Sequence, residues 1–139
     1  MTKDVWDDRY ESIAAFERHL ARNGTVILKF FLNVSRKEQK RRFLERLDLP
    51  DKNWKFLEAD AKEREHWKEY MRAYEDMIRA TATPHAPWYV VPADNKSLTH
   101  LVVCAAIIEA MEDLALSYPK VDGAKKAELA AAREILEGE

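Results

Sequence analysis

The run Thr25-Val-Ile-Leu-Lys-Phe-Phe-Leu-Asn-Val34 decides the fold class of this chain. It is rich in β-branched and aromatic residues and almost unbroken in hydrophobicity, which is typical of a strand covered on both faces in a parallel α/β sheet. A second, shorter run of this kind, Trp88-Tyr-Val-Val91, follows the loop at 81–87. Two such strands, at 26–34 and 88–91, joined by helices predict a parallel crossover and hence an α/β fold in which helices predominate.

The first helix is predicted over residues 4–22, where apolar residues recur every three or four positions and line one face. The residues of this predicted face are Trp6, Tyr10, Ile13, Phe16 and Leu20. Gly24 stands just after the helix and supplies the left-handed stop that commonly ends one.

Three more helices are predicted downstream. Ser35 is the expected cap of a very basic helix, with Glu38 at the capping-box position. Asp60 is the expected cap of the next helix, whose stripe of aromatic and Met residues between Trp67 and Ile78 is interpreted as core. Ser97 is expected to cap a long, mostly buried helix that runs to about residue 117.

The chain has 139 residues, which is room for one domain. Residues 1–118 are predicted to form it, and residues 119–139 a linker and a helical tail. Two strands alone make a poor sheet because each leaves an unpaired edge. We therefore expect another chain, or another copy of this one, to complete the sheet.

The composition excludes several classes of protein. Only three glycines are present, too far apart for the glycine-rich loop that cradles phosphates. The net charge of −2 gives no global case for nucleic acid or an anionic membrane. Cys104 is the single cysteine and is expected to be an inert core thiol. The acidic amino terminus lacks the apolar core of a signal peptide, so a cytoplasmic protein is expected.

Basic residues are concentrated between positions 36 and 64. Residues 36–46 carry six basic side chains against two acidic ones. Like-charged pairs four residues apart, such as Arg36 with Lys40 and Arg42 with Arg46, destabilise an isolated helix. The pattern therefore suggests an anion held between these side chains, although a solvated charged face explains it equally well.

Other candidate sites are weaker. The four histidines show no metal-binding spacing, and no metal site is predicted. Asp94 follows the second strand, where open α/β sheets place ligands, and is a candidate either for ligand binding or for a capping role. Glu58 and Asp60 could be general bases, but their spacing gives no reason to prefer that role.

Several motifs together resemble the polyphosphate kinase 2 family. They are Ile27-Leu-Lys-Phe-Phe-Leu-Asn-Val-Ser35, Glu38-Gln39 with Arg42-Phe43, Trp54-Lys55, Trp67 to Met77, and Ala86-Pro-Trp-Tyr-Val-Val-Pro-Ala-Asp94 with Lys96. The likeness runs from Trp6 to about Tyr118. Asn33 and Asn95 depart from it, since the family commonly has His at the first position and an acidic residue at the second.

The resemblance implies a P-loop phosphotransferase that moves phosphate between polyphosphate and ADP or AMP with Mg²⁺. It implies a lid module at about residues 36–66 whose cations close over the phosphates. The residues that it assigns to polyphosphate are Arg36, Lys37, Lys40, Arg41, Arg42, Arg46, Lys55, Lys62 and Arg64. It places Asp94 and Lys96 near the nucleotide.

The family's phosphate-cradling loop (Walker A) and magnesium-holding aspartate (Walker B) have no counterpart in this sequence, so it resembles the carboxyl-terminal half of such a kinase with no catalytic or metal residue of its own. Two hypotheses follow. The chain is the lid-bearing part of a phosphotransferase, working with a missing half or as a homo-oligomer. Alternatively, it is a non-catalytic module that binds polyphosphate or another polyanion, or a degenerate module, that acts with a partner.

Overall fold

The computed structural model describes residues 3–138, and within them a sheet of two parallel strands, β1 (Lys29–Asn33) and β2 (Trp88–Pro92). Lys29 lies opposite Trp88 and Asn33 opposite Pro92. The predicted α/β class and the parallel pairing are therefore confirmed. Strand β1 is shorter than predicted, and no further strand in the described residues completes the sheet.

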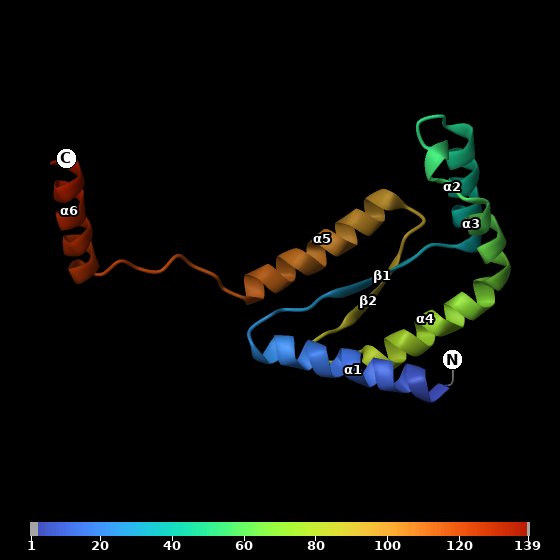
Figure 1. Ribbon diagram of the computed structural model, residues 1–139, viewed down its shortest axis with the longest axis horizontal. Coiled ribbons are helices and arrows are strands. Elements are labelled where there is room, and N and C mark those ends of the chain that lie inside the picture. Colours follow the sequence, from blue (N-terminus) through green and yellow to red (C-terminus); the bar gives the residue numbers. More distant parts are fainter. Residues whose placement is uncertain (1–2, 139) are drawn as a thin grey trace.

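Helices surround this sheet unevenly (Figure 1). Helix α1 packs along α4, and α5 packs on β2. A helical excursion, formed by residues 36–66 and containing α2, η1, α3 and η2, rises from the carboxyl end of β1. Helix α6 stands away from the other elements (Figure 1). The helices are α1 (Lys3–Arg22), α2 (Arg36–Asp48), α3 (Glu58–Lys62), α4 (Trp67–Thr81), α5 (Lys96–Asp113) and α6 (Gly123–Glu137), with short 3-10 turns η1 (Asn53–Lys55) and η2 (Glu63–His66).

Lys29 joins the elements at the amino end of the sheet. Its ammonium donates to both carboxylate oxygens of Glu17 in α1, at 2.7 and 2.9 Å, and to the carbonyl of Thr81 at 2.7 Å. It also lies 5.1 Å from the ring centre of Trp88. Both charged side chains are only 12% exposed. One cation therefore links α1, α4, β1 and β2.

The end of α1 agrees with the sequence, but its apolar face does not. Gly24 has φ +86°, and the amides of Gly24 and Thr25 donate to Ala21 and Leu20 in a Schellman motif. The predicted face, however, is largely open to solvent, and Phe16 is 62% exposed. Within the described residues, the packing of α1 on α4 covers this stripe only in part.

Helix α5 was predicted to be mostly buried, and this is wrong. Only Thr99 and Ala106 are buried, whereas Leu101 is 67% exposed and the predicted core thiol Cys104 is exposed as well. The cap is Asn95 rather than Ser97: Asn95 Oδ1 accepts from the amide of Leu98 at 3.1 Å. No helix among the described residues is long and apolar enough to cross a membrane.

The chain buries little of its surface. Its accessible surface is 11486 Å², whereas a folded monomer of 16.2 kDa exposes roughly 7,500 Å². The buried apolar residues are Ala86, Val91, Ala93 and Ala106. Part of the excess belongs to the exposed tail with α6, but α5 adds to it. A helix that is apolar all round normally lies inside a protein. The exposed faces of α5 are therefore those of an incomplete core.

Candidate functional site

The candidate site lies where the carboxyl ends of β1 and β2 meet. The Ala93 amide extends the ladder by donating to the Asn33 carbonyl at 3.0 Å. One residue further, the Ser35 amide donates to Asp94 Oδ1 at 2.7 Å. Open parallel sheets place their ligands at this end. The two predicted strand ends thus converge, and Asp94 binds backbone there instead of capping α5.

Helix α2 starts directly from this point. Ser35 is its cap, as predicted, because its hydroxyl accepts from the Glu38 amide at 3.1 Å. The second half of a capping box would have Glu38 accept from the Ser35 amide. That amide donates to Asp94 instead, so the Glu38 carboxylate is available for other partners.

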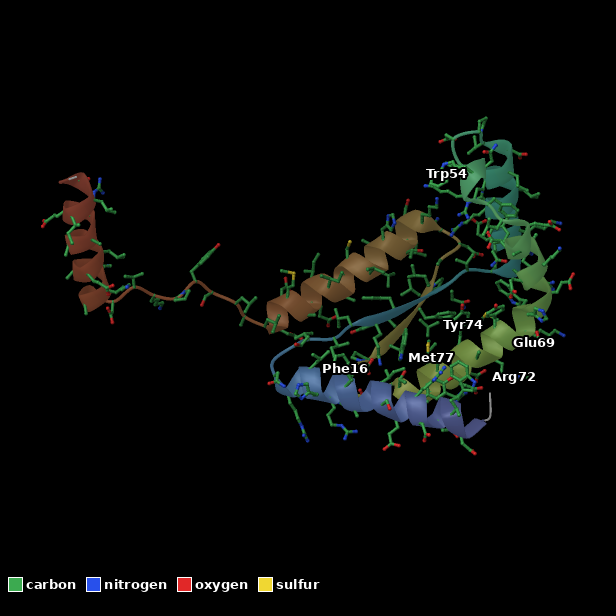
Figure 2. All side chains as sticks on the ribbon, viewed as in Figure 1. Phe16, Trp54, Glu69, Arg72, Tyr74 and Met77 are labelled. Carbon is green, nitrogen blue, oxygen red and sulfur yellow. The ribbon has the colours of Figure 1, made fainter. Side chains whose placement is uncertain are left out.

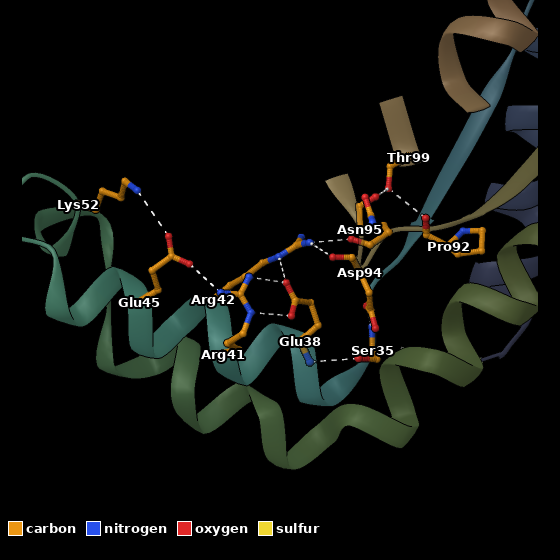
Figure 3. A network of polar contacts seen from close by, with 11 residues as sticks. Ser35, Glu38, Arg41, Arg42, Glu45, Lys52, Pro92, Asp94, Asn95 and Thr99 are labelled. Carbon is orange, nitrogen blue, oxygen red and sulfur yellow. Dashed lines mark hydrogen bonds and ion pairs between the residues drawn. The ribbon is translucent and has the colours of Figure 1, made fainter. Parts of the chain in front are cut away.

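The Glu38 carboxylate binds two arginines of its own helix (Figure 3). Arg41 donates to both of its oxygens, at 2.7 and 2.8 Å, and Arg42 Nε donates to one of them at 2.8 Å. The hydrogen bond from Arg41, with a smaller contribution from Arg42, lowers the pKa of Glu38 to about 2. Glu38 in turn raises the pKa of Arg41. Two of the predicted polyphosphate ligands are therefore paired with a carboxylate of the protein.

Arg36 and Arg64, also in the predicted set, clasp the two arms of the helical excursion. Arg64 donates to the Arg36 carbonyl at 3.1 Å, and Arg36 reaches the Arg64 carbonyl at 3.4 Å. Arg64 also donates to the Gln39 side chain and lies 5.9 Å from the ring centre of Phe43. Phe43 packs edge-on against Phe56 at 5.5 Å. The sequence did not predict that Gln39 and Phe43 take part in this clasp. Their spacing of four residues indicates only that they share a face of the helix.

Four of the cations assigned to polyphosphate have neither a carboxylate within ion-pair distance nor a side-chain hydrogen bond to another group among residues 3–138. Lys37 and Lys40 are exposed on α2. Arg46 is half-buried beside the Phe43 ring, and Lys55 lies 4.9 Å from the ring centre of Trp54. Trp54, which is 73% exposed, projects from the far end of the excursion (Figure 2). These cations are spread along the excursion and do not form one cluster.

The remaining predicted residues are exposed. Lys62 pairs with Glu58 at 2.8 Å one turn away on α3, and Lys96 is the first residue of α5. Asp60 does not cap a helix as predicted: it lies inside α3 and accepts from the Leu57 amide at 3.3 Å. Within residues 3–138, no group of three or more His, Cys, Asp or Glu side chains could hold a metal ion.

Two hollows adjoin the site on the side of α4. One, of about 330 Å³, lies between β1, α2 and α4 and is lined partly by Phe31, Phe43 and Tyr70. The other, of about 630 Å³, is lined by the sheet face at Phe31 and Val90 and by α4. Tyr70 and Tyr74 of the predicted core stripe are 44% and 39% exposed there. Tyr70 donates to Glu63 at 2.6 Å, which raises the pKa of its phenol.

Comparisons with known proteins agree with this arrangement. The family model described as polyphosphate kinase 2 (PPK2) matches residues 1–118. An ADP-polyphosphate phosphotransferase of Rhodopseudomonas palustris is 48% identical over 134 residues, which cover 96% of this chain and 46% of that protein. The crystal structure of polyphosphate kinase 2 from Arthrobacter aurescens TC1 superposes with a TM-score of 0.87 at 40% identity, over 96% of this chain and 47% of that one.

The chain thus spans about half the length of these two relatives. A third relative has a matching length: an uncharacterised protein in the chlN 3′ region of Leptolyngbya boryana is 51% identical, over 97% of this chain and 99% of that protein. The family match covers both strands, the basic helix and α5. The chain belongs to the polyphosphate kinase 2 family.

Proposed function

We propose that this chain is the lid-bearing part of a polyphosphate:nucleotide phosphotransferase. The observation that carries the proposal is the position of α2, a helix with six basic residues that starts at the carboxyl end of β1 and is bonded to the end of β2. Phosphoryl transfer depends on positioning and on cations that neutralise the developing charge. A basic helix at this edge of the sheet can supply the second of these.

The cations with neither a carboxylate partner nor a side-chain hydrogen bond within residues 3–138 are the best candidates for contacts with polyphosphate. Lys37, Lys40, Arg46 and Lys55 can bind phosphate oxygens without first giving up an ion pair. Lys96 at the start of α5 stays the candidate nearest the nucleotide. Counterion release predicts that binding weakens with salt, with a slope of about 0.7 in log K per phosphate contact. If all four cations engage, that slope is roughly 3.

Magnesium, which the family resemblance implies, does not fit the residues present. A Mg²⁺ site is usually built from one or two carboxylates with water and substrate phosphates; Asp94 is the carboxylate at this edge, and one of its oxygens accepts from the Ser35 amide. The described residues hold no other suitable cluster. No step of the reaction is therefore assigned to a metal held by this chain.

Because the sheet is unfinished, we expect a strand of a partner to pair with β1. At the two ends of the ladder, the Lys29 amide donates to the Pro87 carbonyl and the Ala93 amide to the Asn33 carbonyl. Since backbone groups alternate between the two sides of a parallel strand, those of Phe30 and Leu32 point away from β2. The same alternation turns Pro92 outward on β2, and proline is tolerated on an outer edge because it has no amide to donate. The edge of β1 is thus the one suited to a further strand.

The test is an activity assay of the pure chain with polyphosphate, ADP or AMP, and Mg²⁺. We expect no nucleotide product from the chain alone. We expect turnover when a polypeptide equivalent to the unmatched half of the Rhodopseudomonas palustris relative is added. Turnover by the chain alone would contradict the idea that it is incomplete.

A second function, a polyanion-binding module without catalysis, is favoured by one observation. A relative from Leptolyngbya boryana matches this chain over 99% of its own length, so its extent is similar. Salt-sensitive polyphosphate binding with no turnover, even after addition of the other half, would support this function. An absence of binding at low salt would exclude both functions.

A further inference from the structure

We propose that Arg42 is a positioning residue that fixes the lid helix α2 to the turn between β2 and α5, and that it is not a ligand of polyphosphate. The assignment of α2 as a lid rests on the proposed function. The bond pattern of Arg42 itself is independent of that function, so the two can fail separately.

Two of the three guanidinium nitrogens of Arg42, Nε and Nη2, are engaged by the protein (Figure 3). Its Nε donates to Glu38 Oε1 at 2.8 Å, and its Nη2 donates to the carbonyls of Ala93 at 2.7 Å and Asp94 at 3.2 Å. The side chain is 25% exposed. Arginine suits this role because its planar fork of donors can serve several acceptors at once. A phosphate could take the place of these acceptors at Nε and Nη2 only after their bonds had broken.

A second bond crosses between the same two segments. The Ser35 amide donates to Asp94 Oδ1 at 2.7 Å, which joins residues 35 and 94. Arg42, about two helical turns further along α2, binds the carbonyls of the same turn. Two attachment points at different heights along α2 restrict its tilt, whereas one alone would leave it free to pivot. The base of the excursion is therefore held in one orientation over the carboxyl ends of the strands.

Glu38 completes the arrangement from within the helix. It is 13% exposed and holds the Arg42 guanidinium at Nε, which leaves Nη2 aimed at the carbonyls of the turn. Glu38 also partly neutralises the charge of Arg42, so the guanidinium attracts a polyanion less than an unpaired cation does. Arg46, one turn further along α2, has no carboxylate within ion-pair distance in the described part of the chain and is the matched control.

The geometric arm of the test measures the distance between α2 and α5 by pulsed electron paramagnetic resonance. The exposed native Cys104 on α5 takes one spin label, and Asp48→Cys at the exposed end of α2 takes the other. We expect a narrow distance distribution with Arg42 present and a broad one in Arg42→Gln. Arg42→Lys keeps the charge but cannot span three acceptors, so it should also be broad. A narrow distribution in both variants would overturn the proposal.

The binding arm compares the salt dependence of polyphosphate binding. Arg46→Gln should reduce the slope of log K against log salt by about 0.7, the loss of one phosphate contact. Arg42→Gln should leave the slope within about 0.2 of the parent value. A loss of about 0.7 in Arg42→Gln that Arg42→Lys restores would show that Arg42 is a ligand and would overturn the proposal. If the parent chain does not bind polyphosphate, the proposed function fails, and the distance measurement still decides whether Arg42 fixes α2.

Discussion

Replacing Lys29 with methionine should strongly destabilise the chain. The ammonium of Lys29 binds the Glu17 carboxylate and the Thr81 carbonyl, and both members of the ion pair are 12% exposed. Lys29→Met would leave the Glu17 carboxylate nearly buried without a countercharge. Breaking a buried pair in this way costs about 3–5 kcal/mol, a large share of the roughly 5–15 kcal/mol that stabilises a typical domain. With so small a core, this chain should lie at the low end of that range.

Urea unfolding followed by far-ultraviolet circular dichroism measures this cost. The double variant Lys29→Met with Glu17→Leu is the matched control, because it removes both charges and leaves apolar groups of similar volume. It should recover most of the lost stability, since replacing a buried ion pair with apolar side chains is often close to neutral. A loss below about 1 kcal/mol in the single variant, the value of a surface pair, would refute the reasoning.

Three further predictions concern the Glu38 ion pairs, the two edges of the sheet and the cap of α5. The folded-state pKa of Glu38, about 2, is below its unfolded value, so its contribution to stability is present above about pH 5 and lost as the pH falls toward 2. Chemical denaturation across this pH range should show that loss of stability, and Glu38→Gln should lack it. Equal pH profiles for the two proteins would contradict the pairing. Leu32→Pro, on the open edge of β1, should abolish association with the complementary half in sedimentation, whereas Val90→Pro on the outer edge of β2 should not; equal effects would show that β1 is not the pairing edge. Asn95→Ala should cost about 1 kcal/mol in urea unfolding through loss of the α5 cap, whereas Ser97→Ala should change little.

The local structure was largely predictable because it depends on neighbours in the sequence. The hydrophobic runs around Phe30 and Val90 predicted two parallel strands, and Gly24 and Ser35 marked a helix end and a helix start correctly. These signals act within a few residues. The cap of α5 was misplaced by two residues because Asn95 and Ser97 are both good caps, and only the backbone path decides between them.

Burial was predicted less well, since it depends on what lies opposite each face. Helix α5 has the composition of a core helix, but its residues Cys104 and Leu101 are exposed. The sequence shows that α5 is suited to burial, and the structure shows that β2 covers one face of it while Leu101 and Cys104 stay exposed within residues 3–138. Phe16 of α1 is exposed as well.

By itself, the sequence determined the class of fold, the presence of an incomplete sheet and the concentration of positive charge after the first strand. Only the tertiary structure decided how those charges are used. Arg42 reaches carbonyls 51 and 52 residues away, and Arg64 clasps Arg36 across 28 residues. A charge is visible in any sequence, but its partner is set by which distant segments the fold brings within hydrogen-bond reach.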